Sequence, residues 1–205
     1  MAKYKQTYNN SCGAASLMYA AIELKKTKIP GKMEDPIHPL WIAPHDIKEP
    51  NGDKQSETMI YAITSGDKGA PGNTTSGYSL PSRIGKVAAL LGIHSIAFVP
   101  TTLTGSLLLY FYNTEKLDAQ KEGMLLKREQ APVFKEGQFL LKVLRIGAAD
   151  SWVPANGLHY VLERSDKTVM DPSAGQNYPD LNHCIEAFKK GGVFYEDTGL
   201  AILLA

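Results

Sequence analysis

The sequence predicts an α+β domain in which helices come first and an antiparallel sheet follows. Apolar residues recur at helical spacing in residues 12–26 and again in 80–92. The last third of the chain alternates short apolar runs with turn residues, which is typical of paired strands. With 205 residues the chain is long enough for one sizeable core and short for two. We therefore expect a single domain spanning residues 1–205.

The first helix is predicted to begin at Cys12, directly after a polar lead-in. Asn10 or Ser11 is the expected N-cap, because either side chain can accept a hydrogen bond from the unpaired amides of the first turn. Residues 28–79 are rich in Pro and Gly and predict an irregular insertion with a short helix around 57–63. Cys12 is thus expected at a helix start, ahead of a long insertion.

The remaining elements are each marked by an apolar pattern that ends at Gly, Pro or a polar turn. In chain order we expect a helix at 80–92, a strand at 95–99, a helix from about 103 into 115–120, strands at 138–146, 158–164 and 167–170, a helix at 182–190, and closing strands at 193–195 and 200–204.

The charge balance argues against some classes of partner. Lys plus Arg total 22 and Asp plus Glu total 21, so no strong field attracts nucleic acid or an acidic membrane surface. The apolar runs are too short for membrane insertion, and the N-terminus lacks the apolar segment of a secretory signal. We expect a cytoplasmic protein, or one exported without a cleaved signal peptide.

The two cysteines, Cys12 and Cys184, are too few for a disulfide framework in a chain of this length. Reduced thiols are the simpler interpretation, and Cys184, on a predicted amphipathic helix, fits a buried structural role. The sequence has no paired Cys-x-x-Cys spacing. We therefore expect neither a metal site nor a cofactor.

Cys12 is the candidate nucleophile. A thiol attacks acyl groups as the thiolate, which a helix N-terminus favours through its dipole and unpaired amides. The same helix start offers a backbone N–H to an oxyanion, and the small Gly13 and Ala14 leave room for a substrate. Gln6, six residues earlier, can bring a neutral amide donor over the nucleophile.

His159 and Asp171 are the expected partners of that thiol. His159 begins a strand, and Asp171 ends the next strand after a tight turn at Ser165-Asp166. Antiparallel pairing brings the end of the second strand beside the start of the first. Asp171 is therefore expected next to His159, where it can fix the tautomer and orientation that a base needs.

Two stretches resemble the papain superfamily. One is the run at 6–15, in which a glutamine precedes the nucleophile by six residues, and the other combines the His-Tyr-Val at 159–161 with the Asp-Pro at 171–172. The small residues after Cys12 are most similar to the bacteriocin-processing peptidases and to staphopain-like bacterial effector proteases. Ser11 stands where the bacteriocin-processing group usually has Asp.

This resemblance implies a papain-like fold, with an N-terminal helical half packed on a C-terminal antiparallel sheet. It implies a protease in which Cys12 is the nucleophile, His159 the base, Asp171 the orienter and Gln6 the oxyanion donor, acting on a protein or peptide substrate. If the protein is exported, the resemblance further implies that it is a secreted effector.

Two other functions fit the same residues. A glutamine deamidase or a transglutaminase would use the same thioester chemistry on a side-chain amide of a partner protein. A papain-like module that only binds is the non-catalytic alternative. The retention of Gln6, Cys12 and His159 together argues against that last interpretation.

Overall fold

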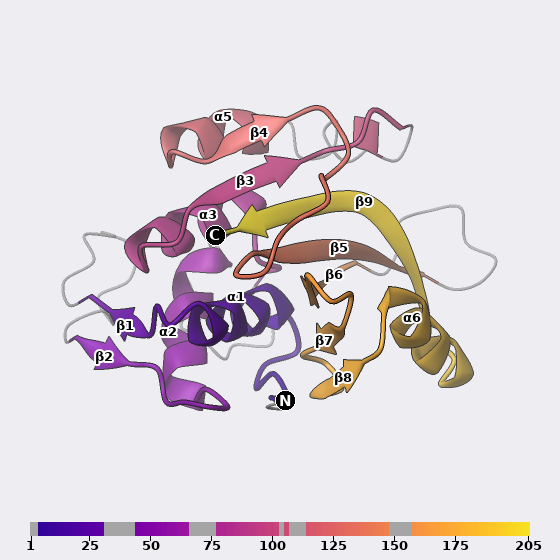
Figure 1. Cartoon of the computed structure of the whole chain (residues 1–205), viewed down its shortest axis with the longest axis horizontal. Coiled ribbons are helices and arrows are strands. Elements are labelled where there is room, and N and C mark those ends of the chain that lie inside the picture. The colour runs from indigo at the N-terminus through magenta and orange to yellow at the C-terminus, as the bar shows by residue number, and fades with distance from the viewer. Residues whose placement is uncertain (1–3, 31–43, 66–76, 103–104, 107–113, 148–156) are drawn as a thin grey trace.

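The computed structural model of the chain describes residues 4–30, 44–65, 77–102, 105–106, 114–147 and 157–205. Its largest element is a seven-stranded sheet (Figure 1). The strands of this sheet are β3 (Ser95–Phe98), β4 (Leu125–Lys127), β5 (Phe139–Gly147), β6 (Leu158–Arg164), β7 (Val169–Asp171), β8 (Gln176–Tyr178) and β9 (Phe194–Leu204). Their spatial order is β4-β3-β9-β5-β6-β7-β8, and only the β3–β4 pair is parallel.

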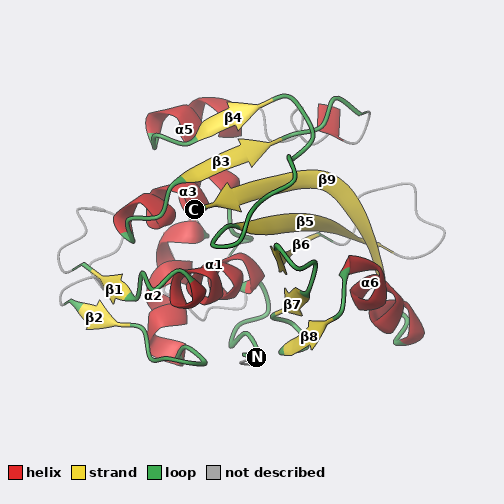
Figure 2. Ribbon diagram, in the orientation of Figure 1, coloured by secondary structure: helices red, strands yellow, loops and turns green. Residues whose placement is uncertain are grey.

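Helices cover both faces of the sheet (Figure 2). They are α1 (Cys12–Glu23), α2 (Lys54–Thr64), α3 (Pro81–Leu90), α5 (Glu115–Lys121) and α6 (Leu181–Lys190). The main core lies between α1, α2, α3 and one sheet face, whereas α6 packs on the other face. A small second sheet pairs β1 (Lys28–Ile29) with β2 (His45–Asp46). Helices and a largely antiparallel sheet confirm the predicted α+β class.

The end of the chain differs from the prediction. The expected strands at 193–195 and 200–204 are one continuous strand, β9. Its register against β5 shifts between Lys142 and Leu144, and the hydroxyl of Thr198 donates to the carbonyl of Val143 at 2.6 Å. Gly199, at φ +74°, supplies the conformation that lets the strand pass this irregularity without ending. The polar residues at this bulge had been interpreted as a turn between two strands.

Other elements also differ, and β1, β2 and β8 were not predicted. The short edge strand β4 was not predicted, because its exposed–intermediate–exposed pattern carries little apolar signal. The helix expected from about 103 into 115–120 is represented by α5, which begins at Glu115. Most of the stretch before α5 lies outside the described residues.

The segment 28–79 is more regular than predicted where it is described. Its helix α2 has eleven residues and buries Met59, Ile60 and Ile63. Asp53 caps this helix by accepting from the backbone N–H of Ser56 at 2.9 Å. Residues 31–43 and 66–76 of the expected insertion lie outside the described part of the chain. The described part includes a helix that supports α1.

Helix α1 is buried along almost its whole length, between α2, α3 and the sheet. Arg164, at the end of β6, donates from Nε to both carboxylate oxygens of Glu23 at 2.9 Å, and from Nη2 at 2.6 Å. This paired contact fixes the C-terminal end of α1 on β6. Within the described residues, no helix is both long and apolar enough to cross a bilayer.

Candidate active site

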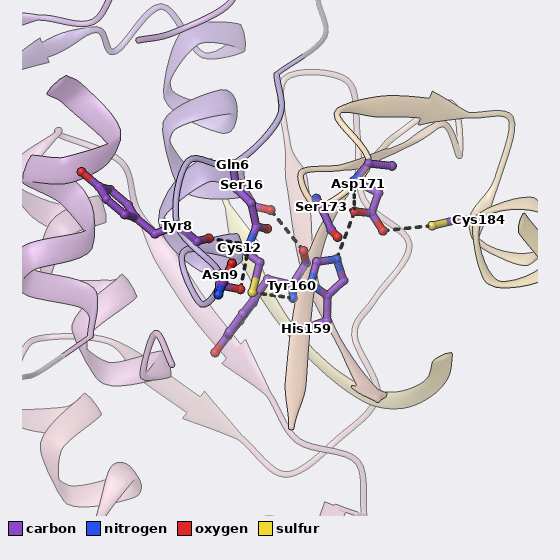
Figure 3. Close-up of polar contacts among 11 residues, drawn as sticks. Gln6, Tyr8, Asn9, Cys12, Ser16, His159, Tyr160, Asp171, Ser173 and Cys184 are labelled. Carbon is purple, nitrogen blue, oxygen red and sulfur yellow. Dashed lines mark hydrogen bonds and ion pairs between the residues drawn. The ribbon is translucent and has the colours of Figure 1, made fainter. Parts of the chain in front are cut away.

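Cys12 is the first residue of α1, as predicted, and its side chain meets the edge of β6. Its sulfur accepts a hydrogen bond from the backbone N–H of Tyr160 at 3.4 Å (Figure 3). Strand β7 pairs with β6 only at Leu162 and Glu163, so the edge of β6 is open at Tyr160. The sulfur occupies the place where a further strand would accept that hydrogen bond.

His159 and Asp171 are in contact, as the antiparallel pairing predicted. Nε2 of His159 donates to Oδ1 of Asp171 at 3.1 Å, and both side chains are almost fully buried. The same oxygen accepts from the backbone N–H groups of Ser173 at 2.7 Å and Ala174 at 3.2 Å. The turn after β7 therefore holds the carboxylate in place while it orients the imidazole (Figure 3).

His159 also interacts with the side chain of Cys12, and this interaction affects the pKa of His159. Burial by itself lowers the pKa of His159. The negative charge of Cys12 and the hydrogen bonds with Asp171 and Cys12 outweigh burial and raise this pKa to about 10, against an ordinary value of 6.5. The imidazole is therefore protonated at neutral pH, and it interacts with the sulfur of Cys12 and with the carboxyl group of Asp171.

Two residues that the sequence did not assign to the site complete the surroundings of His159. The ring of Tyr195 stacks on the imidazole, with ring centroids 5.0 Å apart and an interplanar angle of 21°. Phe188 of α6 stacks on Tyr195 in turn. Such a face is favourable for an imidazolium. Burial, followed by the charge of Asp171, raises the pKa of Tyr195 far above its usual range, so its hydroxyl stays neutral.

Cys184 of α6 is a third residue that the sequence did not assign to the site, and it contacts Asp171. Its thiol donates to Oδ2 of Asp171 at 3.6 Å (Figure 3). Burial, followed by the charge of Asp171, raises the pKa of Cys184 far above its usual range, so the thiol stays protonated. The buried structural role expected for Cys184 therefore includes contact with the predicted orienter. No local pattern in the sequence marks this contact.

Gln6 lies on the lead-in with its side-chain amide turned toward the loop that precedes α1. Nε2 donates to the carbonyl oxygens of Tyr8 at 2.7 Å and Asn9 at 2.9 Å. The backbone N–H of Gln6 donates to the carbonyl of Pro172 at 2.8 Å, directly after Asp171. The structure therefore brings Gln6 to the site, with its amide N–H groups bonded to the lead-in.

The expected N-cap is not formed by a side chain. Ser11 occupies the N-cap position of α1, but its hydroxyl makes no bond to the first-turn amides. It lies 2.5 Å from a carboxylate oxygen of Glu57 and 2.9 Å from the carbonyl of Tyr8. A hydroxyl makes a stronger hydrogen bond to a carboxylate than to a neutral group, which favours the orientation of Ser11 toward Glu57.

Gly13 packs against protein rather than facing a substrate. A Cβ atom at this position would lie 2.5 Å from Cβ of Ser79 and 3.2 Å from the ring of Tyr160. The small residue therefore allows α1 to approach the chain before α3. Beyond Tyr160, an apolar cavity of about 250 Å³ runs between the sheet and α3 and is lined partly by Leu158 and Leu80.

A thiol, an imidazole and a carboxylate in contact on an α+β fold define the class of cysteine-dependent hydrolases. Among the residues that the structure describes, no cluster of three or more His, Cys, Asp or Glu side chains is arranged to hold a metal ion.

Comparison with known proteins places the chain within this class. A family model described as "Invasion plasmid antigen J, cysteine protease" matches residues 4–205. The protein named Cysteine protease IpaJ, from Shigella flexneri, is 32% identical over 214 residues, which cover 98% of this chain and 76% of that protein. No solved structure matches the chain. The chain belongs to the Invasion plasmid antigen J family of cysteine proteases.

Proposed function

We propose that the protein cleaves peptide bonds through a thioester intermediate on Cys12, with His159 as the acid–base residue and Asp171 as its orienter. The observation that carries this proposal is the grouping of three side chains: the imidazole of His159 is 3.1 Å from the carboxyl group of Asp171 and also interacts with the side chain of Cys12. In the proposed reactive state Cys12 attacks as the thiolate and His159 is an imidazolium, and the raised pKa of His159 favours the protonated imidazole.

The steps follow from this starting state. The Cys12 sulfur attacks the carbonyl carbon of the peptide bond, and the carbonyl electrons move onto oxygen. When the tetrahedral species collapses, the C–N bond breaks and the His159 imidazolium gives its proton to the leaving amine. The neutral imidazole then removes a proton from water, which attacks the thioester and releases the acid product. The thiolate and imidazolium are restored.

Asp171 and Gln6 support these steps. Asp171 keeps the proton of Nε2 directed at itself, so that the other ring nitrogen serves the reaction. Gln6 would stabilise the oxyanion together with the backbone N–H of Cys12, whose helix position leaves it without an acceptor in the preceding turn. An oxyanion is a stronger acceptor than a neutral carbonyl, so it can take one N–H of Gln6 from Tyr8 or Asn9.

We extend the proposal to the whole chain, with residues 1–205 forming one papain-like catalytic domain related to the bacteriocin-processing and staphopain-like peptidases. The order of nucleophile, base and orienter and the residues around them support this finer placement. The apolar cavity beyond Tyr160 is suited to an apolar group of a bound substrate. The partner is then a protein or peptide.

A proteome-derived peptide library tests the reaction on many candidate substrates at once. Incubation with the wild-type protein is expected to create new amino termini, detected by amine labelling and mass spectrometry, and Cys12→Ala should create none. Intact peptides that gain about one dalton at glutamine would instead show a deamidase. A library unchanged by the wild-type protein, together with a Cys12 that alkylates no faster than a free thiol, would show a binding module.

A further inference from the structure

Glu57 of α2 is a fully buried carboxylate that binds the segment leading to the nucleophile. The segment in question, residues 4–11, is called the lead-in segment below. The backbone N–H of Thr7 donates to both oxygens of Glu57, at 2.9 and 3.0 Å. The hydroxyl of Ser11 lies 2.5 Å from Oε1, and the hydroxyl of Tyr4 donates to Oε2. One side chain thus contacts the start, the middle and the end of the lead-in segment.

We propose that Glu57 is a positioning residue for the oxyanion side of the active site. By holding the lead-in segment, it fixes the places of the Gln6 amide and of the backbone N–H of Cys12. This inference rests on the proposed function, because it assigns Glu57 a part in the same thioester chemistry. Glu57 does not touch the reacting atoms and acts through these two donors.

Gln6 is held from two sides, and Glu57 provides one of them. The backbone N–H of Gln6 is bonded to the carbonyl of Pro172, next to Asp171, while the N–H of the following Thr7 is bonded to Glu57. Consecutive amides of the lead-in segment are therefore anchored to opposite parts of the molecule. Loss of the Glu57 anchor would remove the bond that holds Thr7, the neighbour of Gln6, on α2.

Neighbours of Glu57 on α2 extend the same attachment. The hydroxyl of Tyr8 lies 2.7 Å from the hydroxyl of Thr58, and the ring of Tyr8 stacks on Tyr61 with centroids 5.7 Å apart. The carbonyl of Tyr8 accepts from the Gln6 amide. Helix α2 therefore controls both the backbone and the side chain of Gln6, and Glu57 is the buried charge at the centre of these contacts.

The thiolate side of the site has different supports. The sulfur of Cys12 is held by the backbone N–H of Tyr160 and by His159, which Asp171 orients. None of these contacts passes through Glu57. Loss of the Glu57 carboxylate should therefore impair a reaction that builds an oxyanion and spare one that needs only the thiolate.

Two small reagents separate these reactions without requiring the natural substrate. p-Nitrophenyl acetate acylates the sulfur through a tetrahedral oxyanion and expels p-nitrophenolate, which is measured as a burst. Iodoacetamide alkylates the sulfur by direct displacement of iodide and forms no oxyanion. Mass spectrometry locates both labels on Cys12.

Glu57→Ala is expected to lower the acylation rate by about 10–10²-fold, as a misplaced donor would, and to leave the alkylation rate unchanged. Glu57→Gln should retain most of the acylation rate. Its carbonyl oxygen can replace Oε1 for Thr7 and Ser11, and its amide nitrogen can donate to the Tyr4 hydroxyl. Gln55→Ala, on the exposed side of the same helix turn, is the matched control and should behave as wild type.

Ser11→Ala is the second variant, since it removes one bond of Glu57 with little change in volume. It should lower acylation in the same selective way, by less than Glu57→Ala, and it decides the matter if Glu57→Ala does not fold. Wild-type acylation rates in folded Glu57→Ala and Ser11→Ala proteins would overturn the proposal. A parallel fall in acylation and alkylation would also overturn it, because Glu57 would then support the thiolate or the fold instead.

Failure of the proposed function gives a different result. If Cys12 were not the nucleophile, the wild-type protein would show no accelerated labelling of this residue by either reagent. Gln6→Ala and His159→Ala are reference variants for these measurements. Gln6→Ala should lower acylation selectively, as Glu57→Ala does, whereas His159→Ala should slow both acylation and alkylation.

Discussion

The sulfur of Cys12 and the backbone nitrogen of Tyr160 lie 3.4 Å apart, although 148 residues separate them in the sequence. This contact fixes the N-terminal end of α1 on the open edge of β6, and the Glu23–Arg164 pair fixes its other end. His159, the residue before Tyr160, is thereby brought to the nucleophile. The geometry of the site thus depends on how one helix is seated on one strand.

The first prediction concerns the protonation of His159. Burial lowers the pKa of this residue, but the negative charge of Cys12, with the contacts of Asp171, outweighs burial and raises the pKa to about 10. His159 should therefore remain protonated at pH 8 in the wild-type protein. In Cys12→Ala the largest raising influence is gone while burial remains, so the pKa of His159 should fall.

Nuclear magnetic resonance of histidine labelled at Cε1 measures this titration, with His159→Gln identifying the signal. Asp171→Asn should also lower the pKa of His159, because it removes a negative charge that raises this pKa and leaves only a weaker, neutral acceptor for the imidazole N–H. A wild-type His159 that titrates near 6.5 would contradict the raised pKa of this residue.

The second prediction ranks the residues of the proposed triad. Cys12→Ala should abolish turnover with the fold intact, and His159→Ala should cost nearly as much. Asp171→Ala should leave more residual rate, because orientation is only part of what the base does. Peptide-library cleavage rates, with circular dichroism as the folding control, test this order. Near-wild-type activity in His159→Ala would remove it as the base.

The third prediction concerns Cys184. Its buried thiol is protonated and donates to Asp171, so iodoacetamide should label Cys12 and leave Cys184 unmodified at neutral pH. Cys184→Ala should slow acylation about fivefold, which corresponds to the loss of one hydrogen bond of about 1 kcal/mol. Cys184→Ser keeps a donor and should retain most of the rate. Equal rates and an equal His159 titration in Cys184→Ala would show that the thiol only fills space.

The fourth prediction concerns the close packing of α1 against Ser79. Gly13→Ala places a Cβ atom 2.5 Å from Cβ of Ser79, so the helix must move away. Alanine normally favours a helix over glycine, but this overlap should reverse the sign and lower the free energy of unfolding by about 1–3 kcal/mol. Urea denaturation measures the change. Adding Ser79→Gly should recover part of it, and a Gly13→Ala protein as stable as wild type would rule out the close contact.

Some of the site was predictable because it depends on short-range structure. A helix that starts at Cys12 follows from the spacing of apolar residues after a polar segment. The contact between His159 and Asp171 follows from a tight turn between two strands, which determines the residues that face each other. Both inferences need only the local chain and its pairing rules.

Other parts depend on contacts between distant segments and had no local signal. Ser11 was expected to cap α1, yet its hydroxyl turns to Glu57, 46 residues further on. Tyr195 and Cys184 reach His159 and Asp171 only because β9 pairs within the sheet and α6 packs on the sheet face opposite α1. The bulge that keeps β9 continuous is likewise a product of its pairing with β5.

The sequence by itself therefore determined the α+β class, the helix start at the thiol, and the pairing of the imidazole with its carboxylate, since periodicity and turn length specify local backbone geometry. The tertiary structure decided how the thiol meets the imidazole, what surrounds them, and which buried carboxylate holds the lead-in segment. Those features arise when segments far apart in the chain bury their surfaces together, and the polar groups enclosed there must find partners among whatever the packing brings close.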